Sequence, residues 1–221
     1  MAELKRQILQ QLNALTVPSA DSVRLVRREF SAQIVQLPAR SVVELAMLLI
    51  ESDELIPRIF AYELVHYHKA ALRSLNSRNI VKLGKGIDSW VAVDTFACYL
   101  SGPAWRERQF PDKVISSWTR SNDRWWRRAA VVSTVALNNK ARGGKGDSRR
   151  TLKICRLVVE DHDDMVVKAL SWALRELSKR EPATVEAFVQ ENRERLHPRV
   201  IREVRNKLTS GLKNPKSVKG K

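Results

Sequence analysis

The sequence has 221 residues, of which 43% are hydrophobic and 29% are charged, as in an ordinary folded protein that can bury a sizeable core. Forty Lys and Arg residues against 24 Asp and Glu residues give a net charge of +16. Such an excess indicates a polyanionic partner, because Lys and Arg displace counterions from phosphates. Nucleic acid is favoured over an anionic membrane, since no basic amphipathic anchor segment stands out. No apolar stretch approaches the ~20 residues of a membrane helix, and the first residues lack the apolar core of a signal peptide, so we expect a cytoplasmic protein.

The cysteines and histidines do not indicate a metal site. Cys98 and Cys155 are far apart in the sequence, and each lies among apolar residues, so we expect two buried, reduced thiols. His66 and His68 are two residues apart in a predicted helix, which directs their side chains to different faces. We therefore predict neither a metal nor a cofactor.

The apolar spacing is helical nearly everywhere, and no segment alternates as a strand would. In chain order, we predict helices over residues 2–15, 19–35, 38–51, 53–69, 88–100, 112–119, 122–138, 148–159, 163–179, 182–195 and 198–208. Their expected N-caps include Asp53, Asp88, Asn122 and Asp163. So many helices of ordinary length, joined by short turns, exceed what one bundle core can serve. The prediction is an all-α solenoid forming a single domain over residues 1–210, followed by a basic tail over residues 211–221 that we expect to be disordered.

A glycine-rich basic segment, Lys140–Arg150, interrupts this pattern. It is not a phosphate-cradling P-loop, because Gly144-Lys145 is followed by Gly146 rather than by Ser or Thr, and no strand precedes it. We expect a flexible loop that can touch backbone phosphates. For the tail after Gly211, phosphate contact and a merely solvated basic segment remain equally open.

Trp172 is misplaced for a core tryptophan. On a wheel of ~100° per residue, the apolar face of the helix 163–179 consists of Val166, Val167, Leu170, Ala173, Leu174 and Leu177. Trp172 falls instead among Lys168, Arg175 and Lys179. Tryptophan is usually core or half-core, but one flanked by three cations is better explained by packing against a nucleotide.

Arg128 presents the opposite anomaly, because it lies on the core side of the helix 122–138, between valines. A guanidinium there needs a carboxylate or a phosphate, and structural ion pairing and phosphate binding both remain open. Arg124 lies one turn earlier on the same face. The other tryptophans are assigned to core packing: Trp105, Trp118, Trp125 and Trp126.

Trp90 and Asp94 are four residues apart and therefore share one face of the helix 88–100, at the shoulder of its apolar stripe. Taken alone, this pair is most simply a surface aspartate beside a core tryptophan. A carboxylate at the edge of a core, however, has a thinned hydration shell and a stronger field on a nearby cation. The combination of three such helices in one basic chain favours a functional surface.

The same segments resemble the AlkD family of DNA alkylation-repair glycosylases. Trp90-Val-Ala-Val-Asp94 is similar to that family's Trp-xxx-Asp pair, and Arg128-Ala-Ala to its Arg-Ala-Ala helix. Lys168-Ala-Leu-Ser-Trp-Ala-Leu-Arg-Glu-Leu resembles its Lys-Ala-x-x-Trp-x-Leu-Arg-Glu motif, the most specific of the three. The order and approximate intervals also match.

The resemblance implies a HEAT-like superhelix whose concave basic face holds duplex DNA, with base excision as its activity. The implied reaction is removal of positively charged purines alkylated at N3 or N7, without a base-flipping pocket. Asp94 would stabilise the positive charge developing on the deoxyribose or place the water. Trp90 and Trp172 would press on the sugar and backbone, and Arg128 would hold a phosphate or keep Asp94 oriented. The cations expected to contact DNA are Arg124, Lys168, Arg175, Lys179, Lys140, Arg142, Lys145, Arg149 and Arg150.

The likeness spans roughly residues 28–208 and is weak before about residue 88. The loop after Asn139 is longer than the family's usual connection. We expect a monomer acting on alkylated double-stranded DNA. Two other functions remain open: a non-catalytic solenoid that binds branched or distorted DNA, and a protein-interaction scaffold. The scaffold is disfavoured by the charge of +16, unless its partner is acidic.

Overall fold

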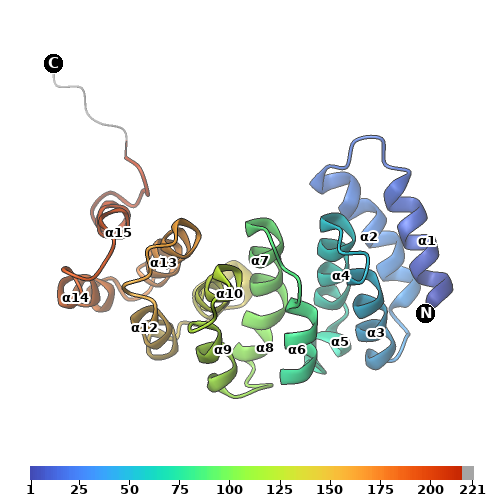
Figure 1. The fold of residues 1–221 in the computed structure, drawn as a ribbon, viewed down its shortest axis with the longest axis horizontal. Helices are drawn as coiled ribbons and strands as arrows, with labels where there is room; N and C mark the ends of the chain where they lie inside the picture. The colour runs from blue at the N-terminus through green and yellow to red at the C-terminus, as the bar shows by residue number, and fades with distance from the viewer. Residues whose placement is uncertain (216–221) are drawn as a thin grey trace. The chain divides into compact units, whose positions relative to one another are not determined.

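The computed structural model describes residues 1–215, and in this part of the chain every regular element is helical (Figure 1). The predicted all-α class is therefore confirmed. The described residues form two compact units, Met1–Pro111 and the chain from Asp112 on. Residues 216–221, most of the tail predicted to be disordered, lie outside the described residues. The HEAT-like superhelix and the single domain over residues 1–210 stay predictions.

The N-terminal unit stacks its helices in two layers. Its elements are α1 (Ala2–Asn13), α2 (Ala20–Ile34), α3 (Ala39–Ile50), α4 (Leu55–Tyr67), α5 (Lys69–Arg73), α6 (Ser77–Gly84), α7 (Trp90–Phe96), a π-helical turn (Ala97–Ser101) and α8 (Gly102–Arg106). Helix α4 packs on both α2 and α7, and these three helices make one layer. Helix α3 packs on α1 and α6 in the same way, and the two layers meet where α3 packs on α4.

The C-terminal unit repeats this arrangement. Its elements are α9 (Asp112–Trp118), α10 (Arg124–Ser133), α11 (Val135–Asn138), a 3₁₀ turn (Lys140–Arg142), α12 (Ser148–Leu157), α13 (Asp164–Leu177), α14 (Pro182–Glu191) and α15 (Pro198–Ser210). Helix α13 packs on α10 and α15, so these three form a layer, and α9 packs on α12 beside it. Each helix thus contacts mainly its neighbours, as in helical-repeat proteins.

The helix starts show where local chemistry differs from the predicted caps. Asp163 caps α13 as predicted, its side chain accepting the N–H of Met165 at 2.9 Å. The other three predicted caps are wrong. Asp53 has a φ of 57° and pairs with Arg58 at 2.8 Å, so its carboxylate serves a guanidinium rather than a helix end. The side chains that cap α7 and α10 belong to the next residue in each case, Ser89 and Asp123. Helices α5, α6 and α8 were not predicted.

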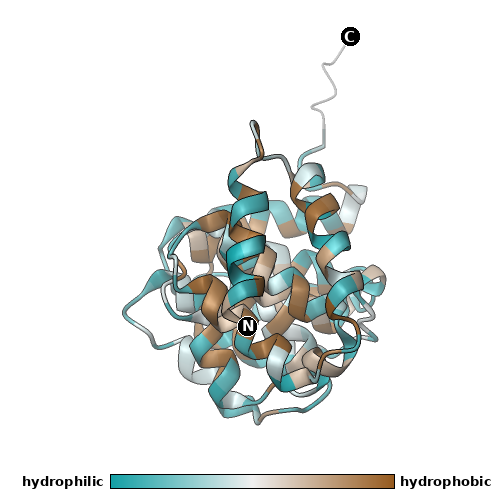
Figure 2. Cartoon of the chain, turned by 90° about the vertical axis from the view of Figure 1, so that its right-hand side faces the viewer, coloured by the Kyte–Doolittle hydropathy of each residue, from teal (hydrophilic) through white to brown (hydrophobic). Residues whose placement is uncertain are grey.

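Apolar side chains from both layers fill the core of each unit, and single helices carry brown and teal turns in Figure 2. Cys98 and Cys155 are both buried, as predicted, and burial raises the pKa of the Cys155 thiol to about 12. Trp105 and Trp118 are core residues, as predicted, whereas Trp125 and Trp126 are only half-buried. Among the described residues, no helix is both long enough and apolar enough to span a membrane.

Candidate functional site

Helix α7 presents an exposed indole and a carboxylate on one edge. Ser89 is the N-cap of this helix, and its side chain accepts a hydrogen bond from the N–H of Ala92 at 3.4 Å. Trp90 is the first helical residue and is 56% exposed, which is unusual for so large an apolar side chain. Asp94 follows one turn later and is half-buried. The edge thus combines an aromatic face with a partly desolvated carboxylate, as the sequence predicted.

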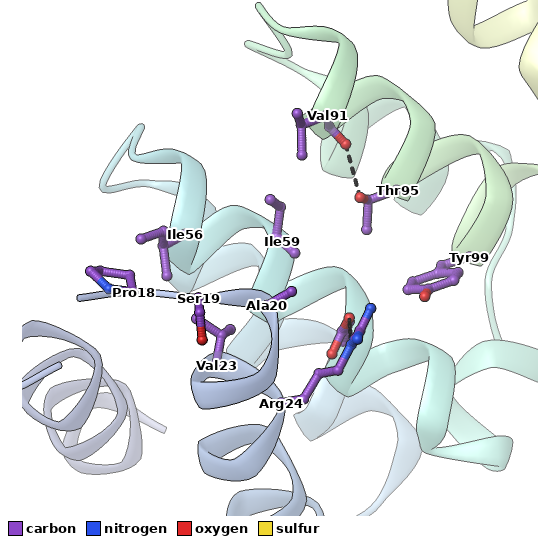
Figure 3. A pocket seen from close by; sticks show the side chains of 11 residues that line it. Pro18, Ser19, Ala20, Val23, Arg24, Ile56, Ile59, Val91, Thr95 and Tyr99 are labelled. Atoms are coloured by element: carbon purple, nitrogen blue, oxygen red, sulfur yellow. Dashed lines mark hydrogen bonds and ion pairs between the residues drawn. The ribbon is translucent and has the colours of Figure 1, made fainter.

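A pocket of about 300 Å³ lies beside this edge within the N-terminal unit, between α2, α4 and α7 (Figure 3). Val91 and Thr95, which follow Trp90 and Asp94 directly in the sequence, form its α7 wall. The Thr95 hydroxyl donates a hydrogen bond to the Val91 carbonyl at 2.8 Å. Because this donor is already used, the α7 wall of the pocket is mainly apolar. Sequence analysis missed the pocket, because its walls come from three helices that only tertiary packing brings together.

The polar part of the pocket is an ion-pair cluster in which Glu63 and Arg27 are buried and Arg24 is exposed. Glu63 on α4 is 5% exposed and lines the pocket together with Arg24. Its carboxylate lies 3.4 Å from Arg27 Nε and 4.0 Å from Arg24 Nε, so it is compensated by two guanidinium groups. The Arg27 guanidinium also lies over the Tyr67 ring, 3.9 Å from its centre. The cluster joins α2 to α4 and supplies charge at an otherwise apolar pocket.

Arg128 is buried on the core side of α10, where the helical wheel placed it. Its Nη1 donates to the backbone carbonyl of Met165 at the start of α13, at 2.5 Å. Arg128 therefore helps to dock α10 on α13. Arg124, one turn earlier, is exposed and lies 3.4 Å from Asp163.

Trp172 is half-buried on α13, between residues of the buried face and cations of the exposed face. Each predicted cation around it has an acidic neighbour. Lys168 lies 2.6 Å from Asp164, and Lys179 lies 2.7 Å from the buried Glu176. The face is therefore less strongly basic than its sequence suggested.

The glycine-rich segment is held more firmly than predicted. Gly146 N–H donates to the Leu137 carbonyl at 2.9 Å, and Arg180 donates to the carbonyls of Asn138 and Gly144. The expectation of a flexible loop is thus replaced by a hydrogen-bonded turn. Four of its predicted DNA contacts have exposed side chains: Lys140, Arg142, Lys145 and Arg149.

Arg150 corrects the prediction for this segment. It is 8% exposed, and its Nε lies 2.6 Å from the carboxylate of Asp147, the N-cap of α12. Burial against this carboxylate withholds the guanidinium from a phosphate outside. We therefore assign Arg150 to the start of α12 rather than to DNA contact.

The predicted site residues fall into two groups. Trp90 and Asp94 lie together on α7 of the N-terminal unit, whereas Arg128 and Trp172 lie on α10 and α13, which pack on each other in the C-terminal unit. All four belong to the layers formed by α2, α4 and α7 or by α10, α13 and α15.

The fold is all-helical and the chain is strongly basic, as expected of a protein that acts on nucleic acid. The family model described as DNA alkylation repair enzyme matches residues 2–208, and the chain belongs to this family. The match includes the helices before residue 88, where the motifs themselves were weak. No curated protein matches the chain.

Proposed function

We propose that this protein is a DNA glycosylase that removes positively charged N3- or N7-alkylated purines from duplex DNA by hydrolysis of the N-glycosidic bond. The observation that carries the proposal is the α7 edge, where the half-buried Asp94 lies one turn from the exposed Trp90 in a chain of the DNA alkylation repair family. A protein that only binds DNA has no need of a partly desolvated carboxylate beside an exposed indole.

The chemistry of the substrate suits a carboxylate acting alone. An alkylated purine already carries a positive charge, so the C1′–N bond can break with its electron pair going to the base, which leaves neutral. Positive charge then develops on the deoxyribose, and a preorganised carboxylate stabilises it in a site of low dielectric. The oxygen of a water molecule forms the new bond to C1′, and the proton that this water loses passes to solvent; in this proposal Asp94 orients the water. This route needs no metal or cofactor.

The remaining residues receive binding roles in this proposal. The faces of Trp90 and Trp172 attract cations and pack on sugars, which favours the positively charged lesion and its backbone. Arg128, which is buried, has a supporting role, because its bond to the Met165 carbonyl holds together the α10–α13 pair that carries Trp172. The exposed cations of the loop and of α13 contact backbone phosphates.

A duplex oligonucleotide with one 7-methylguanine tests this proposal. We expect the wild-type protein to create an abasic site at that position, detected as strand cleavage in alkali, and to leave an unmodified duplex intact. Tight binding of the methylated duplex without an abasic site would favour the alternative, a non-catalytic protein that binds distorted DNA.

A further inference from the structure

The three cations around Trp172 differ in how closely their charge is matched. Lys168 and Lys179 form close ion pairs of 2.6 and 2.7 Å with carboxylates on or near their own helix. The Nε of Arg175 lies 4.0 Å from its nearest carboxylate, that of Glu203 on α15. Arg175 is therefore the least neutralised of the three, and it lies one turn from Trp172 on α13.

A buried hydrogen-bond relay holds Arg175 in place. Glu203 is 4% exposed and accepts a hydrogen bond of 2.5 Å from the hydroxyl of Ser171, which is fully buried. The Ser171 oxygen in turn accepts the Nε–H of Arg175 at 3.2 Å. The other carboxylate oxygen of Glu203 lies 3.5 Å from Lys213 Nζ. The chain Glu203–Ser171–Arg175 thus fixes the guanidinium by its inner edge.

The outer edge of the guanidinium remains available. Within residues 1–215, no protein acceptor contacts the two terminal amino groups of Arg175. Burial lowers the pKa of Arg175, while Glu203 and Glu176 oppose that shift. A partly desolvated guanidinium whose outer N–H groups are unpaired favours an anion that can accept two parallel hydrogen bonds, and a phosphodiester has this geometry.

We propose that Glu203, acting through Ser171, positions Arg175 to bind one DNA backbone phosphate beside Trp172. This inference rests on the proposed role in DNA binding, and Glu203 is a positioning residue in it. Phosphate is preferred to a carboxylate partner because the chain belongs to a DNA repair family and carries a net charge of +16.

Two substitutions of Glu203 separate positioning from charge. Glu203→Gln and Glu203→Met raise the net charge equally, but only the glutamine keeps an acceptor for the Ser171 hydroxyl. We expect Glu203→Gln to bind an unmethylated 15-base-pair duplex within about twofold of wild type, and Glu203→Met to bind at least about fivefold more weakly. Equal affinities for the two variants would overturn the relay, because charge alone would then account for the effect.

Substitutions of Arg175 test the phosphate contact itself. Arg175→Lys keeps the charge but loses the planar pair of donors, so we expect it to lose most of the affinity that Arg175→Ala loses. Full retention of affinity by Arg175→Lys contradicts the proposal. Glu186→Gln is the charge-matched control, since it neutralises an exposed carboxylate of α14 in the same unit that takes no part in the relay. We expect its duplex affinity to stay within twofold of wild type.

A measurement without DNA checks the relay in the folded protein. The Nε–H of Arg175 should give a slowly exchanging NMR signal in wild type and in Glu203→Gln, and that signal should be lost in Ser171→Ala. Its persistence in Ser171→Ala would contradict the assignment. Binding to an unmethylated duplex needs no base release. The relay and the glycosylase activity are therefore tested independently, and failure of one is distinguishable from failure of the other.

Discussion

The two units differ sharply in charge. Residues 1–111 contain 14 Lys and Arg against 11 Asp and Glu, a net charge of +3, whereas residues 112–221 contain 26 against 13, a net charge of +13. The nearly neutral unit holds Asp94, Trp90 and the apolar pocket. The basic unit holds Trp172 and the glycine-rich loop. If the proposed function is correct, the residues that act on the lesion and those that bind the backbone belong to separate parts of the chain.

Both units contain buried, paired arginines, Arg150 with Asp147 in the C-terminal unit, but the exposed cations of the glycine-rich loop belong to the C-terminal unit alone. In the N-terminal unit, the buried guanidinium groups of Arg27 and Arg58 are matched by Glu63 and Asp53. In the C-terminal unit, exposed loop cations accompany the partly matched Arg175. A buried, paired arginine stabilises a fold, whereas an exposed cation releases counterions when it meets a phosphate.

The largest expected effect is that of Asp94→Asn on catalysis. Removing the carboxylate's charge at nearly constant shape should lower the single-turnover rate of base release by at least about 100-fold. Duplex affinity should stay within about threefold, because the charge excess lies in the other unit. Gel-shift and single-turnover measurements on one methylated duplex check both. A rate close to wild type would remove Asp94 from the mechanism.

Neutralising the exposed loop cations should have the next largest effect, and on binding. The variant replaces four residues by Gln: Lys140, Arg142, Lys145 and Arg149. If each meets a phosphate, the slope of log affinity against log salt should become shallower by about 3 to 4, at ~0.9 per contact. The matched control neutralises four exposed cations of the N-terminal unit: Arg40, Arg73, Arg78 and Lys82. An equal change of this slope in both variants would contradict the expectation that the C-terminal unit carries the phosphate contacts.

Replacing Trp90 by Ala should lower the rate of base release about tenfold, since one base- or sugar-packing aromatic contributes roughly 1–3 kcal/mol. Its stability should change little, because the side chain is 56% exposed. Trp105→Ala gives the contrast: that side chain is 1% exposed, and its removal should cost about 3–5 kcal/mol of unfolding free energy. Chemical denaturation of both variants measures these changes in unfolding free energy. Loss of stability in Trp90→Ala comparable to that in Trp105→Ala would make Trp90 a core residue.

Alkaline pH should weaken the fold itself rather than catalysis or DNA binding. Burial raises the pKa of Tyr62 from 10.0 to about 12 and that of Cys155 from 9.0 to about 12. Both groups hold their protons more tightly when folded, so their contribution to the unfolding free energy should be constant below about pH 9 and fall toward pH 12, by at most about 1.4 kcal/mol per pH unit for each group. Urea denaturation across this range measures the slope. Cys155→Ala should flatten it, and an unchanged slope would contradict the assignment.

Periodicity was sufficient to predict the longer helices, because each buries one stripe of apolar residues. It missed α5, α6 and α8, which have five, eight and five residues and are too short to establish a stripe. The predicted caps failed where a neighbouring group competed for the side chain. Asp53 was taken for a cap, but its carboxylate pairs with Arg58. Sequence alone does not show such competition.

The candidate site, which stays a proposal, could be inferred from the sequence only where one helix displays its residues. Trp90, Asp94 and Trp172 could be found from the spacing of residues on single helices. Glu203 and Ser171 could not, since their hydrogen bond depends on the packing of α15 against α13. Arg150 was misassigned for a related reason: a basic residue in a glycine-rich segment looks exposed until the position of Asp147 is known.

The central claim is best tested by the bases that the protein releases. Duplex DNA treated with a methylating agent is incubated with wild type and with Asp94→Asn, and the soluble fraction is analysed by mass spectrometry. We predict free 7-methylguanine or 3-methyladenine with wild type and little of either with Asp94→Asn. Binding of the methylated duplex by wild type with no free base above background would contradict a glycosylase.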